Sequence, residues 1–261
     1  MIGKQRRLHR LFVGPNQRCL LSPLDHGGWI GPVKGLNRPK SIVQQVISGG
    51  SNALLISPGF YKAVASVVPP DVAVVLRVSL TAGLSEQGTQ ETPIASLETA
   101  LSMDADAVAV SVFFGRSGDI DIYRWLADLI DASRRFDMPV VAEMMPPGDR
   151  FYDADAVAHA ARIGMEIGAD VVKTNYCGDM ESFADIVESA PVPIIVAGGP
   201  STGEAASTLH MVRHAVDAGA AGVAIGRNVF QAKNPTTMTA AIAALIHEDA
   251  SVTEAEALLA G

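Results

Sequence analysis

The chain has 261 residues, of which 48% are hydrophobic and 18% are charged, so it can bury a large core and does not have the composition of a disordered protein. A formal net charge of −8 and an isoelectric point of about 5.2 argue against nucleic acid or an anionic membrane as partners. Two cysteines, Cys19 and Cys177, cannot form a disulfide framework, and the sequence contains no apolar signal core and no run of 18 apolar residues. We therefore expect a cytoplasmic protein with reduced thiols.

Eight short apolar segments recur along the chain, and each ends near Gly or Pro. In order they read CLLSPLDHGG, NALLISPG, VAVVLRVSL, DAVAVSVFFG, MPVVAEMMPPG, DVVKTNYCG, VPIIVAGGP and AGVAIGRN. They are rich in Val, Ile and Ala and are continuous rather than alternating, which is typical of parallel strands buried on both faces.

Six segments between these strands place apolar residues three or four positions apart, often with Asp, Ser or Thr at the start and Gly at the end. They cover residues 38–50, 92–104, 119–136, 153–168, 179–190 and 204–219, whereas the connection after the second strand is short and less clear. Eight strands that alternate with helices predict an α/β protein with a TIM (β/α)8 barrel. An open doubly wound sheet is the alternative.

No composition break divides the chain, so we expect one barrel domain over residues 1–261. Residues 1–18 are expected to cover the bottom of the barrel. Residues 248–261 are expected to form a C-terminal tail with a last short helix, at a possible subunit contact.

The sixth strand segment contains Lys173 between apolar residues. A charged ammonium in such a place costs free energy unless it is paired or neutralised. Burial favours the neutral form of an amine, which is the nucleophile that Schiff-base chemistry requires. The alternative is a structural ion pair with Asp25, and the two interpretations are compatible.

The carboxyl ends of the strands form the active site in this fold, which directs attention to the residues there. The first strand segment ends in Asp25 and His26, where Asp25 is either a carboxylate near a cation or a turn residue that caps backbone N–H groups. The last two segments end in AGGPST and IGRNVF. Their glycines and arginine can bind phosphate oxygens, the alternative being tight turns alone: Gly198, Gly199, Gly226 and Arg227. The six histidines are scattered without ligand spacing, so no metal is expected.

Four stretches resemble the DhnA/DeoC-type class I aldolases, which include archaeal-type fructose-bisphosphate aldolase and 2-amino-3,7-dideoxy-D-threo-hept-6-ulosonate synthase. They are LDHGGWIGPVKGL, VVKTNYCGDMESF, PVPIIVAGGP and AGAAGVAIGRNVFQ, within a resemblance that runs from about residue 19 to 247. The KTNY.GD and GRN.FQ motifs look closer to the heptulosonate synthase. The resemblance implies a TIM barrel, an imine on Lys173, proton transfer assisted by Asp25, and substrate phosphate at the two glycine turns. It implies no cofactor and no metal, since the imine itself withdraws electrons.

The sequence departs from this family at the end of the fifth strand. Members usually carry a tyrosine there as a proton donor, in a YPRG turn, whereas this chain has Met145 and has Pro147 in place of the arginine. Glu143 lies two residues before Met145 and shares its face of the strand. We expect Glu143 to act as an acid or base if burial raises its pKa, the alternative being a buried ion pair with Arg77. His26 is a weaker candidate.

The function that follows is a Schiff-base aldolase that joins a ketose phosphate, such as dihydroxyacetone phosphate, to an aldehyde. With aspartate semialdehyde as the acceptor, it would make an aminated seven-carbon precursor of aromatic compounds. The alternatives are a fructose-bisphosphate aldolase, a thiolase-like acyl transferase and a non-catalytic sugar-phosphate-binding barrel. The transferase branch has a second tyrosine where this chain has Asn175, and the lost tyrosine favours the binding barrel. Family members are often multimers, so we expect a homo-oligomer.

Overall fold

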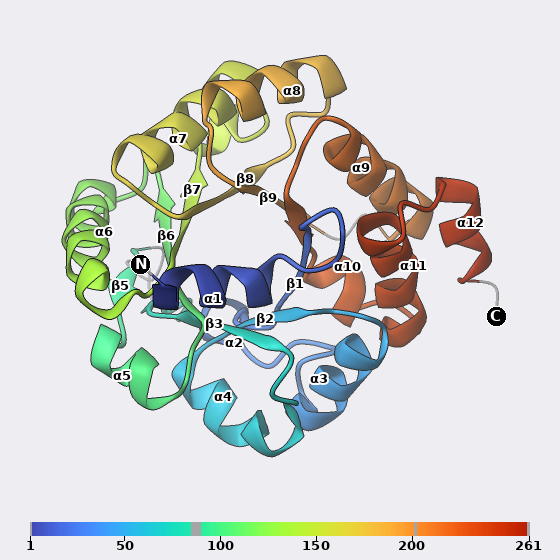
Figure 1. The fold of residues 1–261 in the computed structure, drawn as a ribbon, viewed down its shortest axis with the longest axis horizontal. Coiled ribbons are helices and arrows are strands. Elements are labelled where there is room, and N and C mark those ends of the chain that lie inside the picture. The colour runs from blue at the N-terminus through green and yellow to red at the C-terminus, as the bar shows by residue number, and fades with distance from the viewer. Residues whose placement is uncertain (1, 85–89, 201–202, 260–261) are drawn as a thin grey trace.

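Eight parallel strands close into a barrel with helices around it (Figure 1). The computed structural model describes residues 2–84, 90–200 and 203–259. Around the barrel the strands follow the order β1-β10-β9-β8-β7-β6-β3-β2. Their bounds are Cys19–Pro23 (β1), Ala53–Ile56 (β2), Ala73–Arg77 (β3), Ala107–Phe113 (β6), Val140–Met145 (β7), Val171–Asn175 (β8), Ile194–Ala197 (β9) and Gly222–Ala224 (β10). The predicted TIM barrel is confirmed, and each of the eight apolar segments contains one of its strands.

The barrel strands are buried on both faces, which explains their continuous apolar sequences. One face fills the barrel interior, as Val75 and Val141 do. The other packs against the surrounding helices, as Val140 does. Because side chains alternate along a strand, Glu143 faces the same interior as Val141.

The outer layer consists mainly of helices that follow the strands. They are Pro39–Ser48 (α3), Pro58–Val64 (α4), Leu97–Ser102 (α5), Asp119–Ser133 (α6), Ala154–Glu166 (α7), Met180–Ser189 (α8), Ala205–Asp217 (α9) and Pro235–His247 (α11). All six predicted helical segments contain one of them. Side-chain oxygens accept backbone N–H groups at the start of several, for example Ser96 at α5, Asp153 at α7 and Asp179 at α8.

The sequence analysis missed α11 and the short elements of the loops. Helix α11 is buried on most sides, so its apolar residues do not form the single stripe that marks a surface helix. The short elements are the helices Gly27–Ile30 (α2) and Arg227–Phe230 (α10), the antiparallel pair Ser79–Leu80 (β4) and Thr92–Pro93 (β5), and the 3-10 turns Ala65–Val67, Arg134–Phe136 and Gly148–Arg150. None of the helices in the described ranges is long and apolar enough to cross a bilayer.

Helix α1, Ile2–Leu11, lies across the end of the barrel where the strands begin (Figure 1). Lys4 pairs with Asp170, which precedes β8, at 2.9 Å between Nζ and Oδ1. Arg10 pairs with Asp106, which precedes β6. Leu11 joins the interior core of the barrel. The substrate-sized opening must therefore lie at the opposite end.

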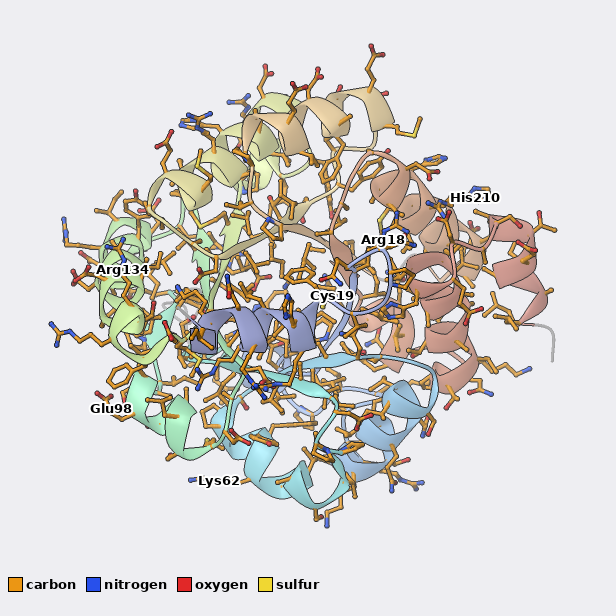
Figure 2. The ribbon with its side chains drawn as sticks, viewed as in Figure 1. Arg18, Cys19, Lys62, Glu98, Arg134 and His210 are labelled. Carbon is orange, nitrogen blue, oxygen red and sulfur yellow. The ribbon has the colours of Figure 1, made fainter. Side chains whose placement is uncertain are left out.

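The last helix, Val252–Ala257 (α12), packs beside α9 and α11 on the outside of the barrel. Figure 2 shows charged side chains such as Lys62, Glu98 and Arg134 at the outer rim, whereas Cys19 lies toward the barrel. Cys19 is fully buried, and this burial raises the pKa of its thiol well above the usual value. Both cysteines are free, and Cys19 is packing material rather than a reactive thiol.

Asn52, directly before β2, links α1 to β1 by hydrogen bonds, so its substitution tests how α1 is held against the end of the barrel where the strands begin. Its Oδ1 accepts the N–H of Leu20 at 2.7 Å, and its Nδ2 donates to the carbonyl of Leu11 at 2.8 Å. Asn52→Ala leaves both partners unsatisfied, so we expect a loss of about 2 kcal/mol in the free energy of unfolding. Urea unfolding measures it, with the exposed Asn16→Ala as the control. A loss no larger than that of the control contradicts this role for Asn52.

Candidate functional site

A cavity of about 670 Å³ opens at the carboxyl ends of the strands. Its volume is in the range of small-molecule sites in proteins. All eight residues that the sequence analysis selected line this one cavity: Asp25, His26, Glu143, Lys173, Gly198, Gly199, Gly226 and Arg227. The fold therefore brings the predicted residues together in one cavity, although they lie as far apart in the sequence as positions 25 and 227.

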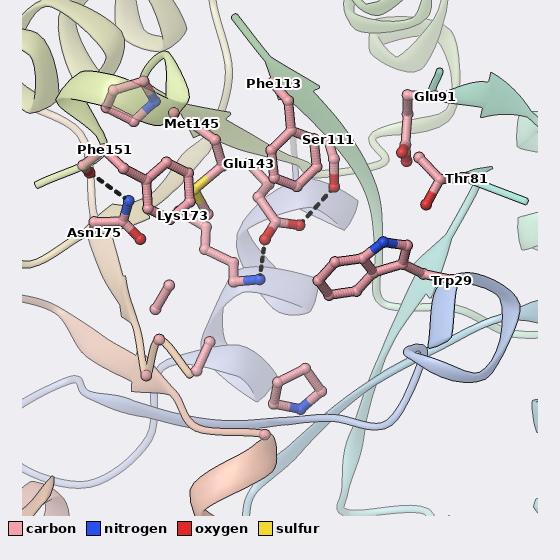
Figure 3. Close-up of a pocket in the computed structure, with 18 of the residues that line it drawn as sticks. Trp29, Thr81, Glu91, Ser111, Phe113, Glu143, Met145, Phe151, Lys173 and Asn175 are labelled. Carbon is pink, nitrogen blue, oxygen red and sulfur yellow. Dashed lines mark hydrogen bonds and ion pairs between the residues drawn. The ribbon is translucent and has the colours of Figure 1, made fainter. Parts of the chain in front are cut away.

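Lys173 and Glu143 are neighbours because β7 and β8 pair in the register Glu143↔Lys173. Both side chains point into the barrel, and Lys173 Nζ donates to Glu143 Oε1 (Figure 3). Lys173 is 5% exposed and Glu143 6%, so water does little to stabilise either charge. The ion pair carries that task, because a buried charge without a partner is strongly destabilising.

Arg77 on β3 reaches the same carboxylate from the other side. Its guanidinium donates to Glu143 Oε2 and, at 2.5 Å, to the hydroxyl of Ser111. Ser111 lies on β6 in register with Glu143 and donates to Oε2 at 2.6 Å. Both oxygens of Glu143 are thus occupied by donors. The ion pair between Glu143 and Arg77, which the sequence analysis offered as an alternative, is present together with the Lys173 contact.

Asp25 pairs with Arg77, and not with Lys173 as the sequence alternative proposed. Arg77 Nε donates to Asp25 Oδ2 at 2.7 Å. The physical reason is the barrel order: β7 lies directly beside β8, so Glu143 takes the position next to Lys173. Asp25, Arg77, Glu143 and Lys173 form one buried network of ion pairs, with two cations and two carboxylates whose formal charges cancel.

The pKa of Glu143 moves in the direction opposite to the one that acid catalysis requires. Burial acts to raise this pKa, but Lys173 and Arg77 outweigh it and hold it well below its usual range. Glu143 is therefore a carboxylate at neutral pH: it cannot serve as a proton donor in the resting site, and its two cations make it a weak base.

His26 lies beside Asp25, with 3.5 Å between Nδ1 and Oδ1. Burial lowers the pKa of His26, and the nearby Asp25 opposes this only in part. The imidazole packs edge-on against Phe230 at 5.2 Å between ring centroids, and its Nδ1 is buried without a hydrogen bond in the described part of the chain. A neutral imidazole with an unused nitrogen is suited to proton transfer.

The phosphate cradle that the sequence predicted needs one correction. The N–H of Gly198 already donates to the carbonyl of Ala224 at 3.0 Å, so this glycine is not a free donor. Its lack of a side chain has a packing reason, because a Cβ there would lie 2.8 Å from Ile225. Gly199 and Gly226 keep their places at the cavity wall. Ser201 and Thr202 of the AGGPST turn lie outside the described residues.

Arg227 is the cation of this end of the cavity. Burial lowers its pKa, yet a guanidinium stays charged at any physiological pH. Its Nε is buried without a hydrogen bond, and no carboxylate pairs with it in the described ranges. A half-buried guanidinium that faces no carboxylate favours a bound anion. Asn228 holds the neighbouring turns together, since its Nδ2 donates to the carbonyl of Gly198 at 3.0 Å.

Tyr152 is a cavity residue that the sequence analysis missed. Met145 lines the cavity where the family has its tyrosine, but Tyr152 enters from the loop between β7 and α7. Its hydroxyl would lie 3.2 Å from a Cβ on Gly199. Burial raises the pKa of Tyr152, and the nearby Arg227 opposes this only in part, so the hydroxyl stays protonated. The distance of seven residues from Met145 and the irregular loop left no periodic signal for it.

Two further charged residues, Glu91 and Arg116, line the cavity and were also missed. Glu91 Oε1 accepts from Ser79 Oγ at 2.6 Å. The side chain of Leu80 packs directly on the backbone of α2 at Gly28, where a Cβ would lie 2.3 Å from Leu80 Cδ2. These residues lie in the long connection from β3 and the turn after β6, where the sequence showed no strand or helix pattern.

Burial raises the pKa of Glu91 to about 7. Arg77 and the Ser79 hydroxyl oppose the rise, whereas Glu143 and Asp25 add to it. Among the described residues, no group of three or more His, Cys, Asp or Glu side chains is arranged to hold a metal ion.

Comparisons with known proteins show the family and its relatives. A DeoC/LacD family aldolase model matches residues 19–232. The 2-amino-3,7-dideoxy-D-threo-hept-6-ulosonate synthase of Halobacterium salinarum is 37% identical over 95% of this chain and 93% of that protein. The 2-amino-4,5-dihydroxy-6-oxo-7-(phosphonooxy)heptanoate synthase of Streptomyces griseus is 32% identical over 94% of this chain and 90% of that protein.

A solved structure extends the likeness to the fold. It is an archaeal fructose-1,6-bisphosphate aldolase with its catalytic lysine covalently bound to the carbinolamine intermediate of the substrate. Its TM-score is 0.84 at 26% identity, over 93% of this chain and 99% of that one.

Glu91 should make the stability of the protein depend on pH. Its folded-state pKa of about 7 is above the usual value of 4.5, so the folded state holds the proton more tightly and loses stability as the pH rises from about 4.5 to 7. Glu91→Gln removes this cost. We expect the stability of the variant relative to wild type to be higher at pH 8 than at pH 5 by on the order of 2 kcal/mol.

Melting temperatures of wild type and variant at the two pH values measure this difference. Glu98→Gln on α5 is the control, because Glu98 is fully exposed and should give no such gain. A Glu91→Gln effect that is equal at pH 5 and pH 8 would show that Glu91 is not a desolvated carboxylate.

Proposed function

Because this chain belongs to the DeoC/LacD family of aldolases, we propose that it joins a ketose phosphate to an aldehyde through an imine on Lys173. The buried pair of Lys173 and Glu143, at the floor of the cavity, is the observation that carries the proposal. The chain is an enzyme of the aldolase class, and the substrates and residue roles that follow are inferences for it. Its single-domain organisation, cytoplasmic location and homo-oligomeric state stay predictions.

Glu143 serves the nitrogen of Lys173 in this mechanism. The ammonium of Lys173 first gives a proton to the carboxylate bonded to it, which frees the lone pair of Nζ to attack the ketone. The same proton then returns to the carbinolamine hydroxyl, which leaves as water, so that an iminium ion and an ionised Glu143 remain. The iminium carries the same positive charge as the ammonium did, so the pairing with Glu143 persists. The iminium then withdraws electrons from the adjacent carbon, which loses a proton and becomes the enamine nucleophile.

The proton at the donor carbon needs a group other than Met145. His26 is neutral, has an unused Nδ1 and lies beside Asp25, so we assign it this transfer, with Asp25 as its charge partner. Arg227, with the turns at Gly199 and Gly226, holds the donor phosphate. The hydroxyl of Tyr152 lies at the same end and can donate to the phosphate as well.

The products that name the two relatives indicate the acceptor. Both contain a hydroxyl on C4 and a ketone on C6, so the aldol bond joins C4 to C5. Breaking it in the Streptomyces griseus product gives dihydroxyacetone phosphate and aspartate semialdehyde. The same cut in the Halobacterium salinarum product gives the same acceptor and a donor fragment without phosphate. Aspartate semialdehyde is therefore the acceptor that we propose for this chain.

Fructose-bisphosphate aldolase activity is the second candidate, because solved structures of such enzymes match nearly the whole chain. Their identities of 20% to 27% are lower than the 37% of the Halobacterium salinarum synthase, which favours the seven-carbon product. The contacts in the cavity give no specific support to an acyl transferase. A purely binding barrel does not fit membership of an enzyme family.

Borohydride trapping tests the imine. With dihydroxyacetone phosphate, we expect a reduced adduct on Lys173, seen by intact and peptide mass spectrometry. Lys173→Ala should show no adduct and lose turnover by at least about 10³-fold, since Lys173 is the only lysine among the described residues that line the cavity. Lys62→Ala, which changes an exposed lysine on α4, is the control. An adduct on a different lysine, or turnover without Lys173, would exclude the mechanism.

Arg227→Ala tests the phosphate end. We expect kcat/KM for dihydroxyacetone phosphate to fall roughly 10–100-fold, because a charge-assisted contact is lost, and that for unphosphorylated dihydroxyacetone to change little. The exposed Arg124→Ala on α6 is the matched control. Equal losses for the two donors would argue that Arg227 supports the structure rather than the phosphate.

A further inference from the structure

We propose that the end of the cavity formed by Glu91 and Arg116 binds the α-amino acid head of the acceptor aldehyde, with the ammonium on Glu91 and the carboxylate on Arg116. This inference rests on the proposed function, because it names the subsite that an aldolase with this acceptor requires. We call Glu91 and Arg116 the head-group site.

The order of the strands places the head-group site opposite the phosphate end. Glu91 follows β3 and Arg116 follows β6, whereas the glycine turns follow β9 and β10. In the closed ring, β3 is four strands from β9 and β6 is four strands from β10, which is half of the circle. Lys173 on β8 and Glu143 on β7 lie between the two ends. Figure 3 shows Glu91 and Thr81 on one side of the Lys173–Glu143 pair, with Phe151 and Asn175 on the other side.

This arrangement matches the shape of the donor. In dihydroxyacetone phosphate the carbonyl carbon that bonds to Lys173 has the phosphate-bearing carbon on one side and the nucleophilic carbon on the other. When Arg227 holds the phosphate, the nucleophilic carbon must point away from it, toward β3 and β6. The aldehyde therefore arrives from the side of Glu91 and Arg116, and its head group extends further in that direction.

Glu91 is a carboxylate that lacks a bonded cation. Its one hydrogen bond in the described ranges comes from the hydroxyl of Ser79, and the nearby Arg77 is held by Asp25 and Glu143. Desolvation dominates its electrostatics, which is why its pKa rises. An ammonium placed against Glu91 would supply the positive charge that this carboxylate lacks and would stabilise its ionised form, as it does in other buried ion pairs.

Arg116 supplies the opposite charge. Its guanidinium carbon lies 3.9 Å from the ring centroid of Phe113, a stacking contact that orients the planar group. Within the part of the chain that the structure describes, no carboxylate forms an ion pair with it, and Glu91 acts on it only at longer range. Both groups line the same cavity without closing on each other, so each keeps its hydrogen-bonding edge for a ligand.

A ligand that bridges them must carry a cation and an anion a few ångströms apart. The head of an α-amino acid does so, because its ammonium and carboxylate share one carbon. A simple aldehyde or a sugar phosphate would leave at least one of the two partly buried charges without a partner, which disfavours it.

Three acceptors separate the two contacts. Aspartate semialdehyde carries both charged groups, 4-oxobutanoate lacks the ammonium, and 3-aminopropanal lacks the carboxylate. For each we would measure kcat/KM with a saturating donor, and, separately, the borohydride-trapped donor adduct in the absence of any acceptor. The adduct reports on the donor half-reaction, in which the head-group site takes no part.

Glu91→Gln should lower kcat/KM for aspartate semialdehyde and for 3-aminopropanal by roughly 10–100-fold and leave 4-oxobutanoate nearly unchanged. Arg116→Gln should show the reverse pattern, a loss for aspartate semialdehyde and 4-oxobutanoate with little change for 3-aminopropanal. Arg116→Lys should recover part of the loss. The exposed Glu98→Gln and Arg124→Gln are matched controls that should alter none of the three.

The outcomes distinguish the aldolase reaction from the head-group site. Absence of any donor adduct on the wild-type protein would overturn the proposed function. A normal adduct without turnover of aspartate semialdehyde, or with variants that affect all three acceptors equally, would overturn the head-group site alone. The crossed pattern of losses would establish it.

Discussion

The carboxylate of Glu143 is the group on which the arrangement of the site depends. It accepts hydrogen bonds from Lys173, Arg77 and Ser111, which come from three different strands. Since all of them are buried, loss of this one side chain would leave Lys173 without its carboxylate and Arg77 with Asp25 alone, and breaking a buried pair typically costs about 3–5 kcal/mol. The same contacts that make the network stable also fix the amine of Lys173 at the centre of the cavity.

Along the strands, the barrel interior changes from apolar packing at the N-terminal end to charged side chains near the mouth of the cavity. Toward the N-terminal end the interior is apolar and α1 covers it, with Leu11 packed inside. One pleat nearer the mouth, the same inward face carries charge instead, as the step from Val141 to Glu143 illustrates. Apolar packing below the network excludes water from it and strengthens each electrostatic contact within it. A rigid floor of this kind lets irregular loops differ in the mouth without disturbing the lysine.

Sequence patterns predicted the elements that obey a period and missed those that do not. Continuous apolar runs of strand length between glycines are typical of parallel strands buried on both faces, so all eight strands could be predicted. Alternation along the fifth of them placed Glu143 on the inward face. Pairing across the barrel was harder, since it depends on strand order. For this reason the expected pairing of Asp25 with Lys173 was wrong, and Asp25 forms its ion pair with Arg77.

The remaining differences arise from loops and from the competition between charges. Burial of Glu143 suggested a raised pKa, but two adjacent cations reversed the shift. Gly198 suggested a phosphate donor, yet its N–H extends the contact between β9 and β10. Tyr152, Glu91 and Arg116 lie in connections whose sequences have no period, so only the folded chain could bring them to the cavity.

The unpaired guanidinium of Arg227 has a consequence for the resting enzyme. Within the described ranges it faces the cavity without a carboxylate, so the empty site is electrostatically prepared for small anions in general. In a cell it meets inorganic phosphate and many metabolites long before it meets its donor. Each of these anions competes with the donor for the same place. The apparent affinity for the donor therefore falls as the concentration of such anions in the surrounding medium rises.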